Sequence, residues 1–178
     1  MSFEHAFATT MQDEGGYANN PKDKGGETYM GIARTMHPDW LGWPLIDECL
    51  RHGDPLSLDP DLVREFYHTE FWQPLRCHLI DPVSAAVAAE LFEASVNCGP
   101  GNGVKFLQRA LNALNSHERL YPDLVEDGAM GAKTLHATMT CLTHRPPRLL
   151  VRCQNGEQYL HYKNWSQHED FPGVFART

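Results

Sequence analysis

The first hydrophobic pattern is a helical stripe at the start of the chain. Phe3, Phe7 and Met11 recur at helical spacing, which places them on one face of an amphipathic helix. Glu14 continues this stripe by one more turn and is followed at once by two glycines. Glycines readily adopt the left-handed conformations that end a helix. We therefore predict a helix whose last turn directs the carboxyl of Glu14 inward.

This placement makes Glu14 the first candidate for chemistry. A carboxyl partly withdrawn from water favours its protonated form, so its pKa is expected to rise toward the value that a general acid needs near neutral pH. The alternative is an ordinary glutamate at a helix end, with its side chain extended to solvent. The residues that follow favour the first interpretation.

Residues 14–32 read EGGYANNPKDKGGETYMGI and are dense in glycine and other turn formers. They predict a tight excursion that carries Asp23, followed by a short extended piece over residues 27–32. Folded back, this small hairpin can bring Asp23 and Thr28 opposite Glu14. Hydrolysis with inversion needs such a two-sided arrangement, with carboxyls ~6.5–9.5 Å apart. Alternatively, Asp23 is a turn cap and Thr28 an ordinary strand residue.

Further apolar stripes predict a helical remainder. They are centred on Leu62 to Tyr67, on Val83 to Phe92, on Val104 to Leu114, on Leu135 to Leu142 and on Leu149 to Tyr162. Asp81-Pro82 has the form of a helix start, with Asp as cap and Pro in the first turn. The helix that follows is apolar nearly all round, so we expect it to be the buried central one.

Several side chains are candidates for contact with a glycan. Asn97 lies in the last turn of the predicted central helix, where its amide either reaches a sugar chain or satisfies the helix's own backbone. Tyr17 and Tyr29 lie within the glycine-rich excursion and can stack on sugar rings. Trp40 and Trp43 lie in what reads as a long irregular connection, where we expect them to cover the core.

Length, charge and composition argue against some classes of function. The chain has 178 residues, of which 42% are hydrophobic, and a net charge of −8. This length suits one compact unit, and the acidic balance argues against a nucleic-acid partner. The five cysteines are widely spaced and read as reduced thiols. The histidines lack metal-ligand spacing, so neither a metal nor another cofactor is expected.

Two expectations concern location. No stretch approaches the length of uninterrupted apolar residues that crosses a bilayer, so stable membrane insertion is not expected. The predicted catalytic motif begins at Glu14, which leaves no room for a cleaved signal peptide ahead of it. We therefore expect synthesis in the cytoplasm, followed by release to the cell wall or periplasm through a pore or another export route.

The same residues carry a family resemblance. The segment 14–32, with E-G-G-Y followed by N-P-x-D-x-G-G-x-T-x-x-G-I, resembles the opening of glycoside hydrolase family 108. Residues 66–112 resemble its continuation, although Phe92-Glu93 stands where the family usually has Phe-Asp. Residues 125–135 (VEDGAMGAKTL) are similar to the D-G-x-x-G-x-x-T pattern of the predicted peptidoglycan-binding region that follows in these proteins.

The resemblance implies fold and activity. The expected fold is mainly α and lysozyme-like, a helical bundle with a small turn-rich β-hairpin beside the active-site helix. A catalytic region would cover residues 1–80 and a helical peptidoglycan-binding subdomain 81–178. The expected activity is a muramidase that cuts the β-1,4 bond between N-acetylmuramic acid and N-acetylglucosamine, with Glu14 as the acid. The spacing from Glu14 to Asp23 matches the E-x8-D of phage-type lysozymes, whereas that from Asp23 to Thr28 is one residue shorter than theirs.

The biological role implied by the resemblance is that of a monomeric phage or prophage endolysin acting on peptidoglycan glycan strands. A bacterial autolysin is the neighbouring alternative. From another class, a cell-wall-binding or secretion-activating protein would keep the fold without turnover. An inward-facing Glu14 favours the enzyme, because a binding protein has no need of a carboxyl that costs stability.

Overall fold

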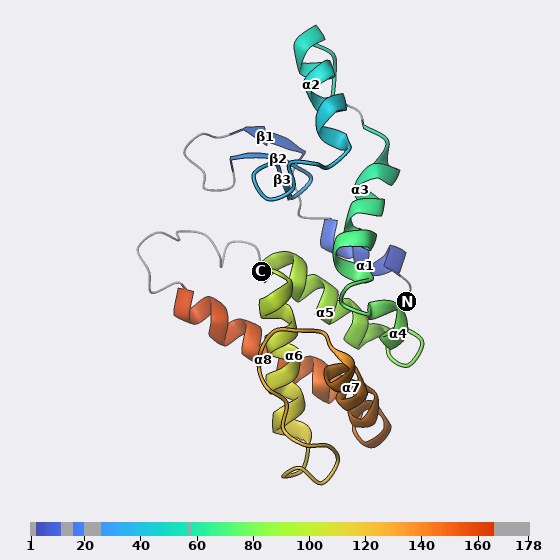
Figure 1. Cartoon of the computed structure of the whole chain (residues 1–178), viewed down its shortest axis with the longest axis vertical. Helices are drawn as coiled ribbons and strands as arrows, with labels where there is room; N and C mark the ends of the chain where they lie inside the picture. The colour runs from blue at the N-terminus through green and yellow to red at the C-terminus, as the bar shows by residue number, and fades with distance from the viewer. Residues whose placement is uncertain (1–2, 12–15, 20–25, 57, 166–178) are drawn as a thin grey trace. The chain divides into compact units, whose positions relative to one another are not determined.

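The computed structural model describes residues 3–11, 16–19, 26–56 and 58–165 (Figure 1). In these residues the chain forms eight α-helices, one π-helical turn and three short strands, which confirms the mainly α fold class. In chain order the elements are α1 (Phe3–Thr10), β1 (Tyr17–Asn19), β2 (Glu27–Tyr29), β3 (Ile32–Ala33), α2 (Gly42–His52), α3 (Pro60–Tyr67), the π-helix η2 (His68–Trp72), α4 (Cys77–Ile80), α5 (Ala85–Cys98), α6 (Pro100–Leu114), α7 (Ala132–His144) and α8 (Pro147–Trp165).

The chain divides into two compact units. One is Phe7–Glu70, here called the N-terminal unit, and the other joins Met1–Ala6 to Phe71–Thr178, here called the helical unit. The boundary near residue 80 expected from the sequence stays a prediction. Among the described helices, none has both the length and the apolar character that crossing a bilayer requires.

A three-stranded antiparallel sheet in the order β1-β2-β3 organises the N-terminal unit. β2 and β3 are joined by two residues, Met30 and Gly31, with φ of 48° and 79°. Positive φ at both positions is the signature of the type I′ hairpin turn, whose twist matches that of the strands. The hydroxyl of Tyr67 in α3 donates to the carbonyl of Met30 over 2.9 Å, so the turn is tied to the helix.

The second helix was missed from the sequence. We expected an irregular connection around Trp40 and Trp43, but residues 42–52 form α2. Two of its leucines, Leu45 and Leu50, are exposed. The apolar residues of α2 therefore do not form one buried stripe, and the sequence pattern for a helix is weak here. The prediction for Trp43 is confirmed, because its side chain is buried and its indole nitrogen donates to the carbonyl of His37.

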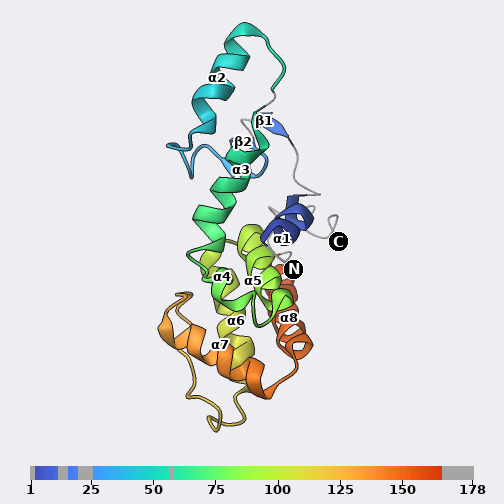
Figure 2. The same cartoon turned by 90° about the vertical axis from the view of Figure 1, so that its right-hand side faces the viewer.

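The helical unit is built around α5. Its inward residues Val87, Leu91 and Phe92 are fully buried, as expected for the central helix, and α5, α6 and α8 pack together with α7 beside the lower half of α6 (Figures 1 and 2). The helix starts later than the sequence suggested. The N–H of Asp81 donates to the carbonyl of Cys77, the first residue of α4, and Ser84 caps α5 by accepting from the N–H of Val87.

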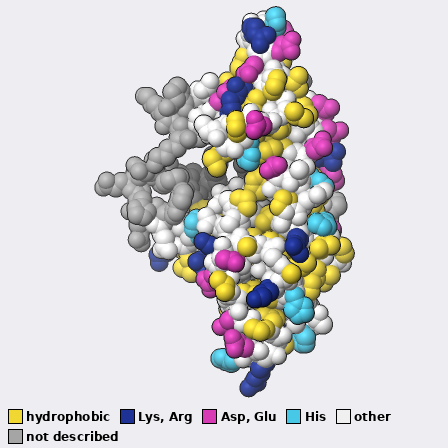
Figure 3. Space-filling view, in the orientation of Figure 1, with side chains coloured by type: hydrophobic (Ala, Val, Ile, Leu, Met, Phe, Trp, Pro, Cys, Tyr) yellow, Lys and Arg dark blue, Asp and Glu magenta, His cyan; other side chains and the backbone are white. Residues whose placement is uncertain are grey.

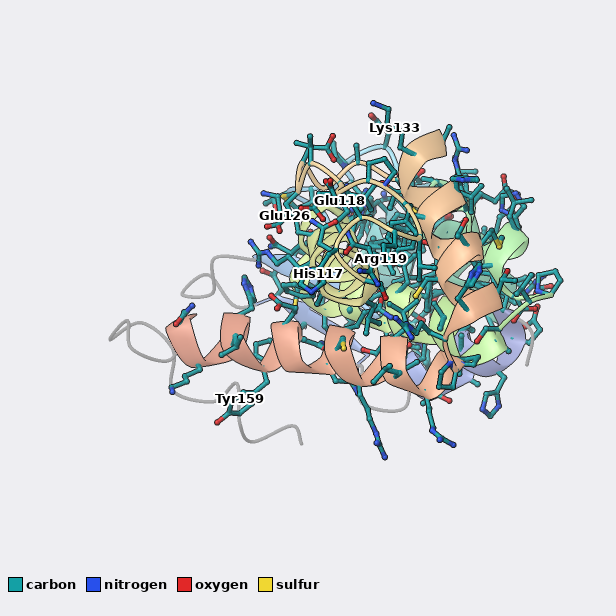
Figure 4. The ribbon with its side chains drawn as sticks, turned by 90° about the horizontal axis from the view of Figure 1, so that it is seen from below. His117, Glu118, Arg119, Glu126, Lys133 and Tyr159 are labelled. Carbon is teal, nitrogen blue, oxygen red and sulfur yellow. The ribbon has the colours of Figure 1, made fainter. Side chains whose placement is uncertain are left out.

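A buried glutamine anchors the connection between α6 and α7. The amide nitrogen of Gln108 donates to Asp127 over 2.8 Å and to Thr134 over 3.2 Å, while its oxygen accepts from the N–H of Gly128. The bond from Gln108 also lowers the pKa of Asp127. The conspicuous D-G-x-x-G-x-x-T pattern therefore holds a loop in place. Figure 4 shows His117, Glu118 and Arg119 in the same connection and Lys133 in the first turn of α7.

Gly128 gives a test of this anchor. It has φ of 77°, and an added Cβ would lie 2.7 Å from the carbonyl oxygen of Gly101. We expect Gly128→Ala to lower the free energy of unfolding by at least about 1–2 kcal/mol, measured by urea denaturation. The matched control is Gly156→Ala in α8, where a Cβ meets nothing within 4 Å and stability should rise by about 0.5–1 kcal/mol. Equal effects of the two substitutions would contradict the anchor.

Candidate functional site

Only some of the predicted site residues lie in the part of the chain that the structure describes. Glu14 and Asp23 lie outside the described residues. Thr28 is half-buried at the centre of β2, opposite Ala18 of β1 and Ala33 of β3. Tyr17 and Tyr29 face each other across β1 and β2. The hairpin thus brings Thr28 and the two tyrosines together on one small sheet, with Thr28 on the face opposite Tyr29 because side chains alternate along a strand.

A chain of polar contacts fixes this hairpin. The hydroxyl of Tyr17 donates to Glu27 over 2.9 Å, and Glu27 lies 3.0 Å from the Nε of Arg34 in an ion pair. Partial burial raises the pKa of Tyr17, and the acceptor Glu27 adds to the rise. Glu27, the next carboxylate in the hairpin after Asp23, is therefore engaged in holding the sheet.

Arg34 connects the hairpin to α2. Its Nη2 donates to one oxygen of Asp47 over 2.7 Å and its Nη1 to the other over 3.3 Å. The guanidinium carbon also lies 4.5 Å from the ring centroid of Trp43, within the range of a cation–π contact. The bond to Asp47 is the main cause of the raised pKa of Arg34. Nothing in the spacing of these residues pointed to this network.

An aromatic cluster lies beside the hairpin. The ring of Tyr29 stacks on Trp40 at 6.0 Å between centroids and an interplanar angle of 27°, while Trp43 meets Trp40 edge-on at 5.2 Å. Phe66 of α3 approaches Trp40 at 6.1 Å. Tyr29 thus contributes to a built aromatic surface, which is the kind of surface that sugar or alkyl groups contact.

A groove opens next to this cluster. It encloses about 450 Å³ between the segment 36–41 and the helix formed by α3 and η2. No local sequence pattern predicts this groove, because its two walls come from segments that are distant in the sequence. Both walls belong to the N-terminal unit.

Asn97 lies in the helical unit, in the last turn of α5 as expected, with its side chain exposed. The backbone carbonyl at the end of that helix is satisfied by a different amide, since Asn102 donates to the carbonyl of Cys98 over 2.8 Å. The role of Asn97 toward a glycan stays a prediction.

The carboxyl of Glu90 in α5 has a strongly raised pKa. Burial against α8 raises its pKa to about 7, and the charge of Glu93 adds to this. The amide of Asn155, with its nitrogen toward α5, donates to both carboxylate oxygens and works in the opposite direction. A raised pKa often marks a catalytic group. Neither of the two grooves that we identify in the described residues is lined by Glu90, so we assign it to the α5–α8 packing.

The described residues hold no group of three or more His, Cys, Asp or Glu side chains arranged to bind a metal ion.

Comparison with known proteins gives two family matches. The profile of Glycosyl hydrolase 108 matches residues 7–99, and that of a Predicted Peptidoglycan domain matches residues 102–169. The structure is similar to a solved structure of SagA from Brucella abortus, with a TM-score of 0.61 and 23% identity over 98% of this chain and 83% of that one. No curated protein matches the chain.

The Arg34 network predicts an unequal effect of two similar substitutions. Arg34→Lys loses the two-pronged contact with Asp47 and the planar contact with Trp43, so we expect a loss of about 1–2 kcal/mol in the free energy of unfolding. Arg51→Lys is the control, because the side chain of Arg51 is exposed at the end of α2 and its replacement should change stability by less than about 0.5 kcal/mol. Equal losses in urea denaturation would show that the network does not hold the hairpin.

Glu90 predicts a pH dependence of stability. Its pKa is raised from 4.5 to about 7 in the folded protein, so between these values the native state holds a proton that the unfolded state has released. Stability therefore falls as the pH rises from about 4.5 to 7. Glu90→Gln should remove this fall and be more stable than the wild type at pH 8 by about 1–3 kcal/mol. Parallel stability curves for the two proteins would contradict it, with the exposed Glu48→Gln as control.

Proposed function

The chain belongs to the glycosyl hydrolase 108 family, and we propose that it is a muramidase that hydrolyses the β-1,4 bond between N-acetylmuramic acid and N-acetylglucosamine in peptidoglycan. The observation that carries this proposal is the family match over residues 7–99, which contains the E-G-G-Y motif of Glu14. The peptidoglycan domain matched over residues 102–169 supports the same substrate.

Within this proposal Glu14 protonates the leaving oxygen, while Asp23 and Thr28 position the attacking water. The support for Thr28 is its place in the central strand of a hairpin that is tied down at both ends, by Arg34 and by Tyr67. A hydroxyl on such a rigid support keeps its position without further ordering, which is what positioning a reactant requires. Tyr17, Tyr29 and Asn97 are proposed to contact the glycan.

We also propose the biological setting of an endolysin, a monomer made in the cytoplasm and released to the wall at lysis. Its test is expression in bacteria with and without a pore-forming partner. Lysis that depends on the pore supports this setting, and lysis without any pore contradicts it. Sedimentation of the purified chain decides the oligomeric state.

Glu14→Gln gives the main test of the acid. The substitution is nearly isosteric and removes only the proton donor, so turnover of purified cell walls should fall by about 10²–10⁴-fold while the protein stays folded. Glu90→Gln is the matched control, since it removes another carboxyl with a raised pKa and should leave lysis intact. If the folded Glu14→Gln protein lyses walls normally, Glu14 is not the acid. If the wild type binds walls without cleaving them, the chain is a binding protein.

Asp23 is tested through the pH profile of kcat/KM. A general acid donates only while protonated, so activity should fall on the alkaline side as Glu14 ionises, and the acid limb should report the carboxylate that acts as base. We expect Asp23→Asn to shift or abolish the acid limb on a soluble glycan oligomer. An unchanged acid limb would remove Asp23 from the mechanism.

A further inference from the structure

The groove beside the aromatic cluster is lined in two chemically distinct ways. Leu62, Phe66 and Trp40 supply apolar wall, whereas Asp39, Glu65 and Glu70 supply carboxylates. All three carboxylate residues are exposed, and no ion pair within the described residues joins them to a basic side chain. No Lys or Arg lies among the described residues that line the groove. Figure 3 shows acidic side chains gathered along the side where α3 lies.

Trp40 is held in a built position. Tyr29 stacks on one side of it, and Trp43 and Phe66 meet it edge-on. Its six-membered ring also lies close to Gly42, where an added Cβ would clash with the indole. The absence of a side chain at position 42 therefore allows the indole to lie in the groove wall.

The helical wall has an unusual backbone. Thr69 and Glu70 belong to the π-helix η2 that directly follows α3. π-Helical turns are rare and often occur at functional sites. This segment supplies one carboxylate of the groove, and α3 supplies another through Glu65.

The side chains that line the groove suit some chemical groups of peptidoglycan better than others. At neutral pH a carboxylate only accepts hydrogen bonds, so the rim suits a ligand that donates them. The wall can donate from Thr69, His37 and the indole N–H of Trp40, but it holds no lysine or arginine side chain, so a neutral acetamido sugar would leave the charge of the three carboxylates unmatched. An alkylammonium group fits better, because its methylenes match the apolar wall, its three donors match carboxylates, and its charge is attracted by an indole face.

We propose that this groove binds the free side-chain ammonium of the diamino acid in the stem peptide of peptidoglycan. The inference rests on the proposed substrate and adds a specificity to it. The chain would prefer strands whose stem peptides still carry this amine over strands in which the amine has been used in a cross-link.

The test uses the full chain and two soluble probes in calorimetric titration. One is an N-acetylglucosaminyl-N-acetylmuramyl tripeptide ending in lysine, and the other is the same molecule with its lysine amine acetylated. We expect acetylation to weaken binding roughly 5–10-fold. The double variant Glu65→Gln/Glu70→Gln should bind both probes equally weakly. Glu48→Gln, an exposed acid of the same unit outside this groove, should keep the discrimination.

Gly42→Ala provides a second variant that removes no charge. Its added methyl displaces the Trp40 ring, so the preference for the free amine should drop while the folded state, checked by circular dichroism, remains. Equal binding of the two probes by the wild type would overturn the proposal, as would discrimination that survives in the double variant. Tight binding of a peptide-free sugar oligomer that is lost in Trp40→Ala but not in the double variant would assign the groove to glycan instead.

The test of amine binding in the groove can be distinguished from the test of muramidase activity. Cell-wall turnover is measured on the same proteins. Turnover without amine discrimination leaves the muramidase standing and overturns the groove, whereas amine discrimination without turnover does the reverse.

Discussion

The guanidinium of Arg34 is the interaction on which the N-terminal unit depends. It is paired with Glu27 of the hairpin on one side and with Asp47 of α2 on the other, and it lies over the ring of Trp43. The side chains of the pair with Glu27 are only partly exposed, with 30% for Arg34 and 17% for Glu27, so the attraction within this pair is less screened than that of a surface pair. A hairpin of such short strands has little stability by itself, and this network supplies what the strands lack.

The position of the aromatic groove follows from the same constraint. Arg34 holds Trp43 in α2, Trp43 meets Trp40 edge-on, and Trp40 in turn stacks on Tyr29 of β2. The hairpin that carries Thr28 and the wall of the groove are therefore parts of one connected arrangement. A change at Arg34 would be felt both at the proposed water-positioning residue and at the proposed ammonium groove.

The sequence predicted what depends on local pattern and missed what depends on distant partners. The long helices were predictable because Val87 and Leu91 in α5, and Leu107 and Leu111 in α6, are buried and recur at helical spacing. The start of α5 was misjudged because Asp81-Pro82 carries a cap signal, yet the N–H of Asp81 is already used by α4. At the candidate site the motif identified the hairpin, but the Arg34 network and the groove unite residues far apart in sequence. The roles of Glu14 and Asp23 rest on the local sequence pattern and on the family motif.

The central claim is the bond that is cut, and analysis of the products tests it most directly. Purified peptidoglycan is digested with the wild-type chain, the new reducing ends are reduced with borohydride, and the fragments are identified by mass spectrometry. The account predicts that the reduced sugar is N-acetylmuramic acid. Reduced N-acetylglucosamine at the new ends, or fragments separated only at amide bonds, would contradict it.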